Sequence, residues 1–280
     1  MHLLMILVAL GLAWFLRLGC IGQTESWTDR SWRALWLFLF PPLLLIMTGL
    51  AVLCMGPQGR MIGLSAGWLS YLLAISFLGL AGVKCIKLGW QGWRSLRQIH
   101  TYPLLTLGGS PSRILDTPVP FAALIGFWQP ELVVSQGLLN TLDHAHLDAV
   151  ITHEQAHYYY RDTFWFFWLG WVRSCTAWLP NTQALWQELL VLRELRADRW
   201  AAQQVDSLLL AESLLMVASY SVMPSEICAA FSEAAQRNRL EERIEALLAE
   251  PNILPKPRFR WSWTWFLLAL LPLVAVPFHT

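Results

Sequence analysis

The amino-acid sequence predicts a mainly α-helical membrane protein that carries a small α+β domain on the cytoplasmic side. Three observations support this fold class. Of the 280 residues, 56% are hydrophobic and only 14% are charged, whereas a soluble domain has about 25% charged residues. Several uncharged stretches are long enough to cross a bilayer. The middle of the chain changes to short β-prone pieces separated by Gly, Pro and Asp.

About four transmembrane helices are expected, because about 20 apolar residues cross the hydrocarbon core. We predict spans at residues 1–22, 34–55, 61–83 and 258–280. No Lys or Arg precedes the first apolar run, which favours an uncleaved span over a signal peptide. Residues 1–98 would then form an N-terminal membrane region, and Pro41 and Pro42 should kink its second helix.

The orientation follows from Lys and Arg near the span ends, because these residues favour the cytoplasmic side. They gather after the first span, after the third and before the fourth: Arg17, Arg30, Arg33, Lys84, Lys87, Arg94, Arg97, Lys256, Arg258 and Arg260. This pattern predicts a multi-pass protein of the inner (plasma) membrane. Both termini would lie outside, and residues from about 84 to 260 would lie in the cytoplasm.

Residues 163–187 form a further apolar segment, with Arg173 as its only charge and many Trp and Phe side chains. We interpret it as a helix that dips into the membrane interface and turns back at Pro180 and Asn181, since Trp favours headgroup depth. The alternative is an additional span, which the length of the segment also allows.

Residues 99–257 are predicted to form the cytoplasmic domain. Short strands are expected at 112–115, 122–125 and 132–134, which indicates a small sheet. Asp143 is a predicted N-cap for the helix that follows the sheet. Three more helices are expected, at 188–205, 206–222 and 236–250.

The chemistry of the chain is most visible in the HExxH pattern that begins at His153. Positions i and i+4 share one face of a helix, so His153 and His157 can direct their imidazoles at one metal ion. Glu154 is then placed to act on a water molecule at the metal rather than to ligate it. This pattern predicts a zinc site.

A third ligand is available from a later helix, in the run from Arg193 to Asp198. Glu194 can complete a set of two histidines and one carboxylate with an open position, as in catalytic zinc sites. Asp198, one turn beyond, can accept the second N–H of a ligating His. Asp162, five residues after His157, is predicted to position a helix or a ligand.

Composition also excludes some functions. The net charge is only +1, so no basic excess suggests direct nucleic-acid binding. The five cysteines are scattered and contain no CxxC pair, so we interpret them as buried apolar residues rather than as a disulfide framework.

The pattern HExxHxxxxD from His153 to Asp162, followed by ExxxD from Glu194 to Asp198, resembles that of membrane-integrated gluzincin metallopeptidases. It is similar to the β-lactam-sensing signal transducers (BlaR/MecR-like) and, more distantly, to the HtpX and CAAX prenyl protease group. The stretch from Ala177 to Asn181 and the Arg243-Ile244 pair resemble segments of the transducers. The 280 residues contain no extracellular penicillin-binding domain, so we do not expect a β-lactam receptor.

The resemblance implies a zincin-like fold and zinc-dependent hydrolysis of peptide bonds. His153, His157 and Glu194 would hold Zn²⁺, and Glu154 would transfer the proton from water to the leaving amine. Three residues are candidates for stabilising the oxyanion: His144, His146 and Arg196. For each of them, a role in capping or in solvent contact is the favoured interpretation.

A peptide substrate would add to an exposed strand. The candidate strand is 118–125, with Phe121, Ala122, Ala123 and Leu124 as substrate-binding residues; an ordinary core strand is the alternative. The expected partners are the lipid bilayer and a cytoplasmic or membrane-proximal protein, with a transcriptional repressor as one candidate. The sequence carries no signal of oligomeric state.

Two other functions stay open at this point. One is a membrane signalling or scaffold protein with a relic zincin domain, against which the intact Glu154 argues, because a structural metal site needs no general base. The other is a prenyl-peptide or quality-control protease. It is less favoured, because the charge pattern leaves few spans to enclose a chamber in the membrane.

Overall fold

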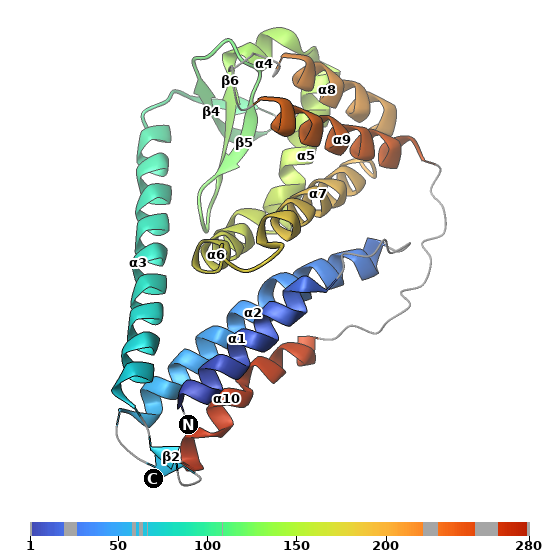
Figure 1. Cartoon of the computed structure of the whole chain (residues 1–280). Helices are drawn as coiled ribbons and strands as arrows, with labels where there is room; N and C mark the ends of the chain where they lie inside the picture. The colour runs from blue at the N-terminus through green and yellow to red at the C-terminus, as the bar shows by residue number, and fades with distance from the viewer. Residues whose placement is uncertain are drawn as a thin grey trace. The chain divides into compact units, whose positions relative to one another are not determined.

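The computed structural model is mostly helical and contains a small mixed sheet (Figure 1). It describes residues 2–19, 27–57, 60–61, 64–65, 67–107, 109–220, 229–249 and 263–278. The chain divides into two compact units. Residues 1–88, 168–189 and 254–280 make up the first unit, and residues 89–167 and 190–253 make up the second.

The first unit is built from long apolar helices. Helices α1 (His2–Leu18) and α2 (Trp27–Met55) lie side by side (Figure 1), and α3 (Trp68–Ile99) begins in this unit. Ala9 and Ala13 of α1 are buried against Phe40 and Leu44 of α2, because small side chains let two helices approach closely. The last described segment consists of η1 (Trp263–Leu270), α10 (Leu271–Val274) and η2 (Val276–Phe278).

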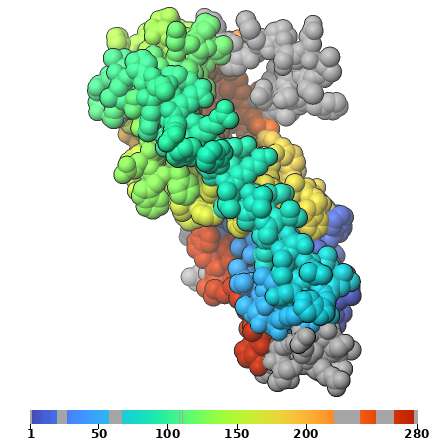
Figure 2. Space-filling model, turned by 90° about the vertical axis from the view of Figure 1, so that its left-hand side faces the viewer, coloured from blue at the N-terminus to red at the C-terminus, as the bar shows by residue number. Residues whose placement is uncertain are grey.

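Two helices of the described chain, α2 and α3, are long and apolar enough to cross a membrane. Most apolar side chains of α3 are exposed: Leu69 is 64% and Ile86 is 74% accessible. Figure 2 shows the teal side chains of α3 uncovered on the face turned to the viewer. Two such helices are weak evidence of membrane association, and four spans are not shown.

The predicted boundaries of the spans need correction. Helix α1 covers 17 residues and ends at Leu18, so the described helix is shorter than the predicted span 1–22. Helix α2 begins at Trp27, before the predicted span 34–55, and continues through its two prolines. The start of span 61–83 is wrong: Arg60–Met61 (β1) pairs with Leu64–Ser65 (β2), and α3 begins at Trp68. Hydropathy measures apolar content, which a hairpin and a helix share.

The prediction of one continuous transmembrane α-helix over 258–280 is also wrong for its described part. Its described part, 263–278, is mainly 3₁₀-helix with a single α-helical turn. Pro272 and Pro277 have no backbone N–H and interrupt the α-helical hydrogen-bond ladder. Residues 258–262 lie outside the described chain.

The apolar segment 163–187 does not form one helix. It is divided between α6 (Asp162–Cys175) and α7 (Thr182–Ala201), with a turn at the predicted place, where Asn181 has a φ of 55°. The Arg17 side chain donates hydrogen bonds to Thr182 Oγ1 and to the Phe38 carbonyl, each at 3.1 Å. Asn181 Nδ2 donates to the Arg17 carbonyl at 2.8 Å. These contacts hold the turn against α1 and α2 and exclude a single spanning helix.

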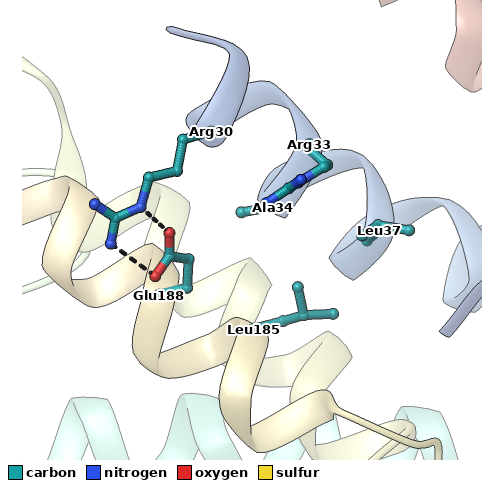
Figure 3. A pocket seen from close by; sticks show the side chains of 6 residues that line it. All are labelled: Arg30, Arg33, Ala34, Leu37, Leu185 and Glu188. Atoms are coloured by element: carbon teal, nitrogen blue, oxygen red, sulfur yellow. Dashed lines mark hydrogen bonds and ion pairs between the residues drawn. The ribbon is translucent and has the colours of Figure 1, made fainter. Parts of the chain in front are cut away.

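A small pocket lies between α2 and the first turns of α7 (Figure 3). Arg30 and Glu188 form an ion pair at its edge, and Arg30 Nη2 donates to Glu188 Oε2 at 2.9 Å. Ala34, Leu37 and Leu185 line its apolar side. The ion pair therefore tethers the start of α7 to α2. The pocket itself holds none of the predicted site residues.

The second unit contains a four-stranded sheet with the order β3-β4-β6-β5. Its strands are Leu104–Leu107 (β3), Ser110–Leu115 (β4), Ala122–Ile125 (β5) and Glu131–Ser135 (β6). β4 and β6 are parallel, and the other pairs are antiparallel. The three predicted strands therefore occur, and β3 adds a fourth.

Helices α4 (Gln136–Thr141), α5 (His144–Tyr159), α8 (Ser207–Tyr220) and α9 (Ala229–Leu248) belong to the second unit. Val134 of β6 is buried with Leu147 and Ile151 of α5, so one face of the sheet and α5 share a core. The predicted helices occur, with α7 ending at Ala201 and α9 beginning before residue 236. Residues 221, 222 and 250 of the predicted helices lie outside the described chain.

Gly137 carries a testable constraint on this unit. A Cβ at this position would lie 2.1 Å from the Pro118 carbonyl oxygen, which is backbone and cannot rotate away. Replacing Gly137 by Ala is therefore expected to destabilise the protein by about 3 kcal/mol. Chemical unfolding in detergent, followed by circular dichroism, measures this change. Gly92→Ala in α3 is the control, since its Cβ would meet nothing within 4 Å, and equal stability of the two variants would contradict the prediction.

Candidate metal centre

Helix α5 presents the HExxH pattern with defined ends. Asp143 is its N-cap, and its side chain accepts a hydrogen bond from the His146 N–H at 2.9 Å. The helix ends at Tyr159 with Tyr160 as its C-cap, and Arg161 follows in the left-handed region with a φ of 56°. This residue reverses the chain direction, so Asp162 at the start of α6 returns toward the last turn of α5.

Three predicted ligands come together between α5 and α7. His153 Nε2 lies 3.2 Å from His157 Nε2 and 3.3 Å from Glu194 Oε2, and His157 Nε2 lies 3.7 Å from the same oxygen. Zinc bonds of about 2.0–2.1 Å in a tetrahedron place neighbouring ligand atoms about 3.4 Å apart. The two nitrogens and one oxygen therefore fit a zinc ion with one open position.

The second nitrogen of each imidazole faces a buried carboxylate. His157 Nδ1 lies 2.7 Å from Asp162 Oδ2, and His153 Nδ1 lies 2.9 Å from Asp198 Oδ1. A carboxylate only accepts, so His157 donates from Nδ1 to Asp162, while His153 Nδ1 forms a close ion-pair contact with Asp198. The Nε2 atoms of both rings face the ligand cluster, where a metal would bind. Asp162 and Asp198, which are 2% and 1% accessible, thus orient the two histidines.

Three arginines balance the carboxylates of this cluster. Arg193 donates to Glu194 Oε1 at 2.6 Å, and Arg196 pairs with Asp162. Arg243 of α9 donates to both oxygens of Asp198, at 2.7 and 2.8 Å. The sequence pattern assigns no role to Arg193 or Arg243. Two sequence features could have pointed to them: Arg193 directly precedes Glu194, and Arg243 belongs to the Arg-Ile pair.

The pKa values show how strongly these groups are coupled. Burial disfavours the charged form of His153, but Asp198 and Glu194 outweigh this and raise its pKa to about 9. Burial likewise opposes charge on Glu194, yet its hydrogen bonds to the histidines hold its pKa well below the usual value. At neutral pH a metal ion must therefore displace the proton from His153.

Glu154 differs from its neighbours. In the described part of the chain no arginine or lysine forms an ion pair with it, although it lies beside the ligand pair on α5. Burial raises the pKa of its carboxyl group. A carboxyl group without a fixed cationic partner and with a raised pKa is suited to accept and release a proton.

The candidate substrate strand is an edge strand. β5 pairs only with β6 within the described sheet, and it packs against α5. Ala122 and Leu124 pack against the core of the unit, whereas Phe121, just before the strand, is 38% accessible. The free edge therefore offers backbone groups, and two of the four predicted substrate-binding side chains point to the core.

The predicted oxyanion groups are engaged elsewhere. His146 lies 2.7 Å from Asp143 and 3.5 Å from Glu212, and these carboxylates raise its pKa, with Asp143 the larger cause. Arg196 pairs with Asp162, and its guanidinium stacks on Tyr160, 4.2 Å from the ring centroid. His144 is exposed at the start of α5. The structure does not bring these side chains to the ligand atoms.

Part of the chain is similar to a known protein family. Residues 111–221 match the sequence model of Peptidase family M48. The matched region contains His153, His157, Glu194 and Asp198 but ends before α9. It supports a zincin-type metallopeptidase and does not distinguish the transducer group from the HtpX group. No curated protein and no solved structure matches this chain.

Proposed function

We propose that this protein is a membrane-anchored zinc endopeptidase with its active site at the junction of α5 and α7. The observation that carries the proposal is the donor cluster of His153, His157 and Glu194, whose spacing fits tetrahedral zinc. Glu154 lies on the same helix, and no Lys or Arg of the described residues forms an ion pair with it; it would supply the acid–base group that a structural zinc site does not need.

Each side chain of the site has its own role in the proposed hydrolysis. His153, His157 and Glu194 would hold the zinc ion, which when bound would act as a Lewis acid and lower the pKa of water toward neutrality. Glu154 accepts the proton of the attacking water and returns it to the leaving amine. Asp162 and Asp198 keep the two imidazoles in the required tautomer. The free edge of β5 would hold an extended peptide by backbone hydrogen bonds beside α5.

The proposed setting is the cytoplasmic face of the inner membrane. Residues 1–98 and 258–280 would anchor the chain, residues 99–257 would form the peptidase domain, and 163–187 would dip into the interface. The charge pattern and two apolar helices support this topology. Phe127 and Trp128, in the loop after β5, add aromatic surface next to Phe164 of α6, and Trp128 is 60% accessible.

The substrate would be a cytoplasmic or membrane-proximal protein, since β5 lies close to this aromatic surface along the chain. A transcriptional repressor is the candidate that follows from the likeness to the β-lactam-sensing transducers. That likeness rests on the Ala177–Asn181 stretch and on the Arg243-Ile244 pair.

Metal removal tests the proposed function. The purified chain in detergent is expected to contain one zinc ion per molecule and to cleave fluorescein-labelled casein. Treatment with ortho-phenanthroline should abolish cleavage, and added zinc should restore it, because the three ligand side chains alone provide no Lewis acid. The non-chelating meta isomer is the control. Cleavage that persists in the zinc-depleted chain would contradict the proposal.

A further inference from the structure

We propose that Arg243 of α9 is a positioning residue of the metal centre, which holds Asp198 in the orientation that fixes His153. This inference rests on the proposed zinc site. It concerns a residue outside the region that matches the peptidase family, since that match ends at residue 221.

The contact between Arg243 and Asp198 is bidentate. Arg243 Nε lies 2.7 Å from Asp198 Oδ2, and Nη2 lies 2.8 Å from Oδ1. Two parallel hydrogen bonds from a planar guanidinium fix both the position and the rotation of the carboxylate. The Arg243 side chain is 15% accessible and that of Asp198 is 2%, so water competes little for these bonds.

The same carboxylate faces the metal ligand. Asp198 Oδ1, which accepts from Arg243 Nη2, also lies 2.9 Å from His153 Nδ1. Rotation of Asp198 would therefore move the acceptor away from the imidazole. Because the charged contact of Asp198 with Nδ1 favours one orientation of the His153 ring, Arg243 acts on the metal site through Asp198.

The positive charge of Arg243 also lies close to Glu194, a proposed metal ligand. Its Nη1 is 3.5 Å from Glu194 Oε2, the oxygen that faces the two imidazoles. Asp198 and Glu194 are both largely buried carboxylates, and a buried charge is costly unless an opposite charge compensates it. Arg243 thus offsets two acidic groups from one position on α9.

A set of variants tests the inference by zinc affinity, measured at one pH by competition with a chromophoric chelator. Arg243→Gln is expected to weaken zinc binding about 10–100-fold, the usual effect of removing a residue that holds a metal ligand in place without binding the metal itself. Arg243→Lys should retain part of the affinity, because an ammonium keeps the charge but not the two parallel bonds. The control is Arg239→Gln, one turn earlier on α9, for which the described residues show no contact with the site carboxylates.

A double-mutant cycle separates positioning from a general structural effect. If Arg243 acts through Asp198, Arg243→Gln should change zinc affinity little in the Asp198→Asn background. Full additivity of the two changes would overturn the inference. A folded Arg243→Gln variant whose zinc affinity stays within about twofold of wild type would also overturn the inference. If Arg243→Gln does not fold, the same result in Arg243→Lys would overturn it. A wild-type chain without zinc would overturn the proposed function as well, so the two failures are distinguishable.

Discussion

Glu154→Gln is expected to lower kcat by about 10²–10⁴-fold, the usual contribution of a general base, while zinc stays bound. The amide has nearly the same shape as the carboxyl group but cannot accept the proton of the attacking water. The proposed ligand atoms belong to His153, His157 and Glu194, so the variant should keep the zinc content of the wild-type protein. Casein cleavage and zinc analysis of the same preparation measure both quantities.

The control for this variant is Glu212→Gln. Glu212 lies on α8, faces His146 and is 54% accessible, so the same chemical change is made outside the ligand cluster. Its activity should stay at the wild-type level. If Glu154→Gln cleaves casein as fast as wild type, Glu154 is not the general base, and a relic zincin domain becomes the better interpretation.

Glu194→Gln is expected to weaken zinc binding by at least about 10²-fold, more than the loss of an outer partner. The change replaces an anionic oxygen ligand by a neutral amide and leaves Arg193 without the carboxylate to which it donates at 2.6 Å. Competition with a chromophoric chelator measures the affinity. Activity at limiting zinc should fall in parallel and recover in part when zinc is added in excess.

Glu188→Gln is the matched control, because Glu188 lies earlier on α7 and pairs with Arg30 instead of the histidines. Zinc affinity of this variant should equal that of wild type. Equal affinity in Glu194→Gln would remove Glu194 from the ligand set. A larger loss in Asp198→Asn than in Glu194→Gln would instead identify Asp198 as the third ligand.

Local patterns in the sequence predicted several features that the structure shows. The three predicted strands form, because alternating apolar residues between turn formers need only local information. Asp143 caps α5, since an N-cap depends on the next three residues. The turn at Asn181 also occurs where predicted. The spans were predicted less well, because hydropathy does not distinguish an α-helix from the paired strands Arg60–Met61 and Leu64–Ser65 or from 3₁₀-helix.

The sequence by itself determined that His153 and His157 share a helix face, because helical periodicity is a property of the local chain. The later ExxxD pattern offered Glu194 and Asp198 as candidates, but only the tertiary structure decided that these groups and Arg243 meet the two histidines. Glu194 and Asp198 arrive from α7 and Arg243 from α9, and β5 lies at the edge of the sheet. The physical reason is that helix packing and strand order depend on contacts between segments far apart in the chain, which spacing along the sequence does not encode.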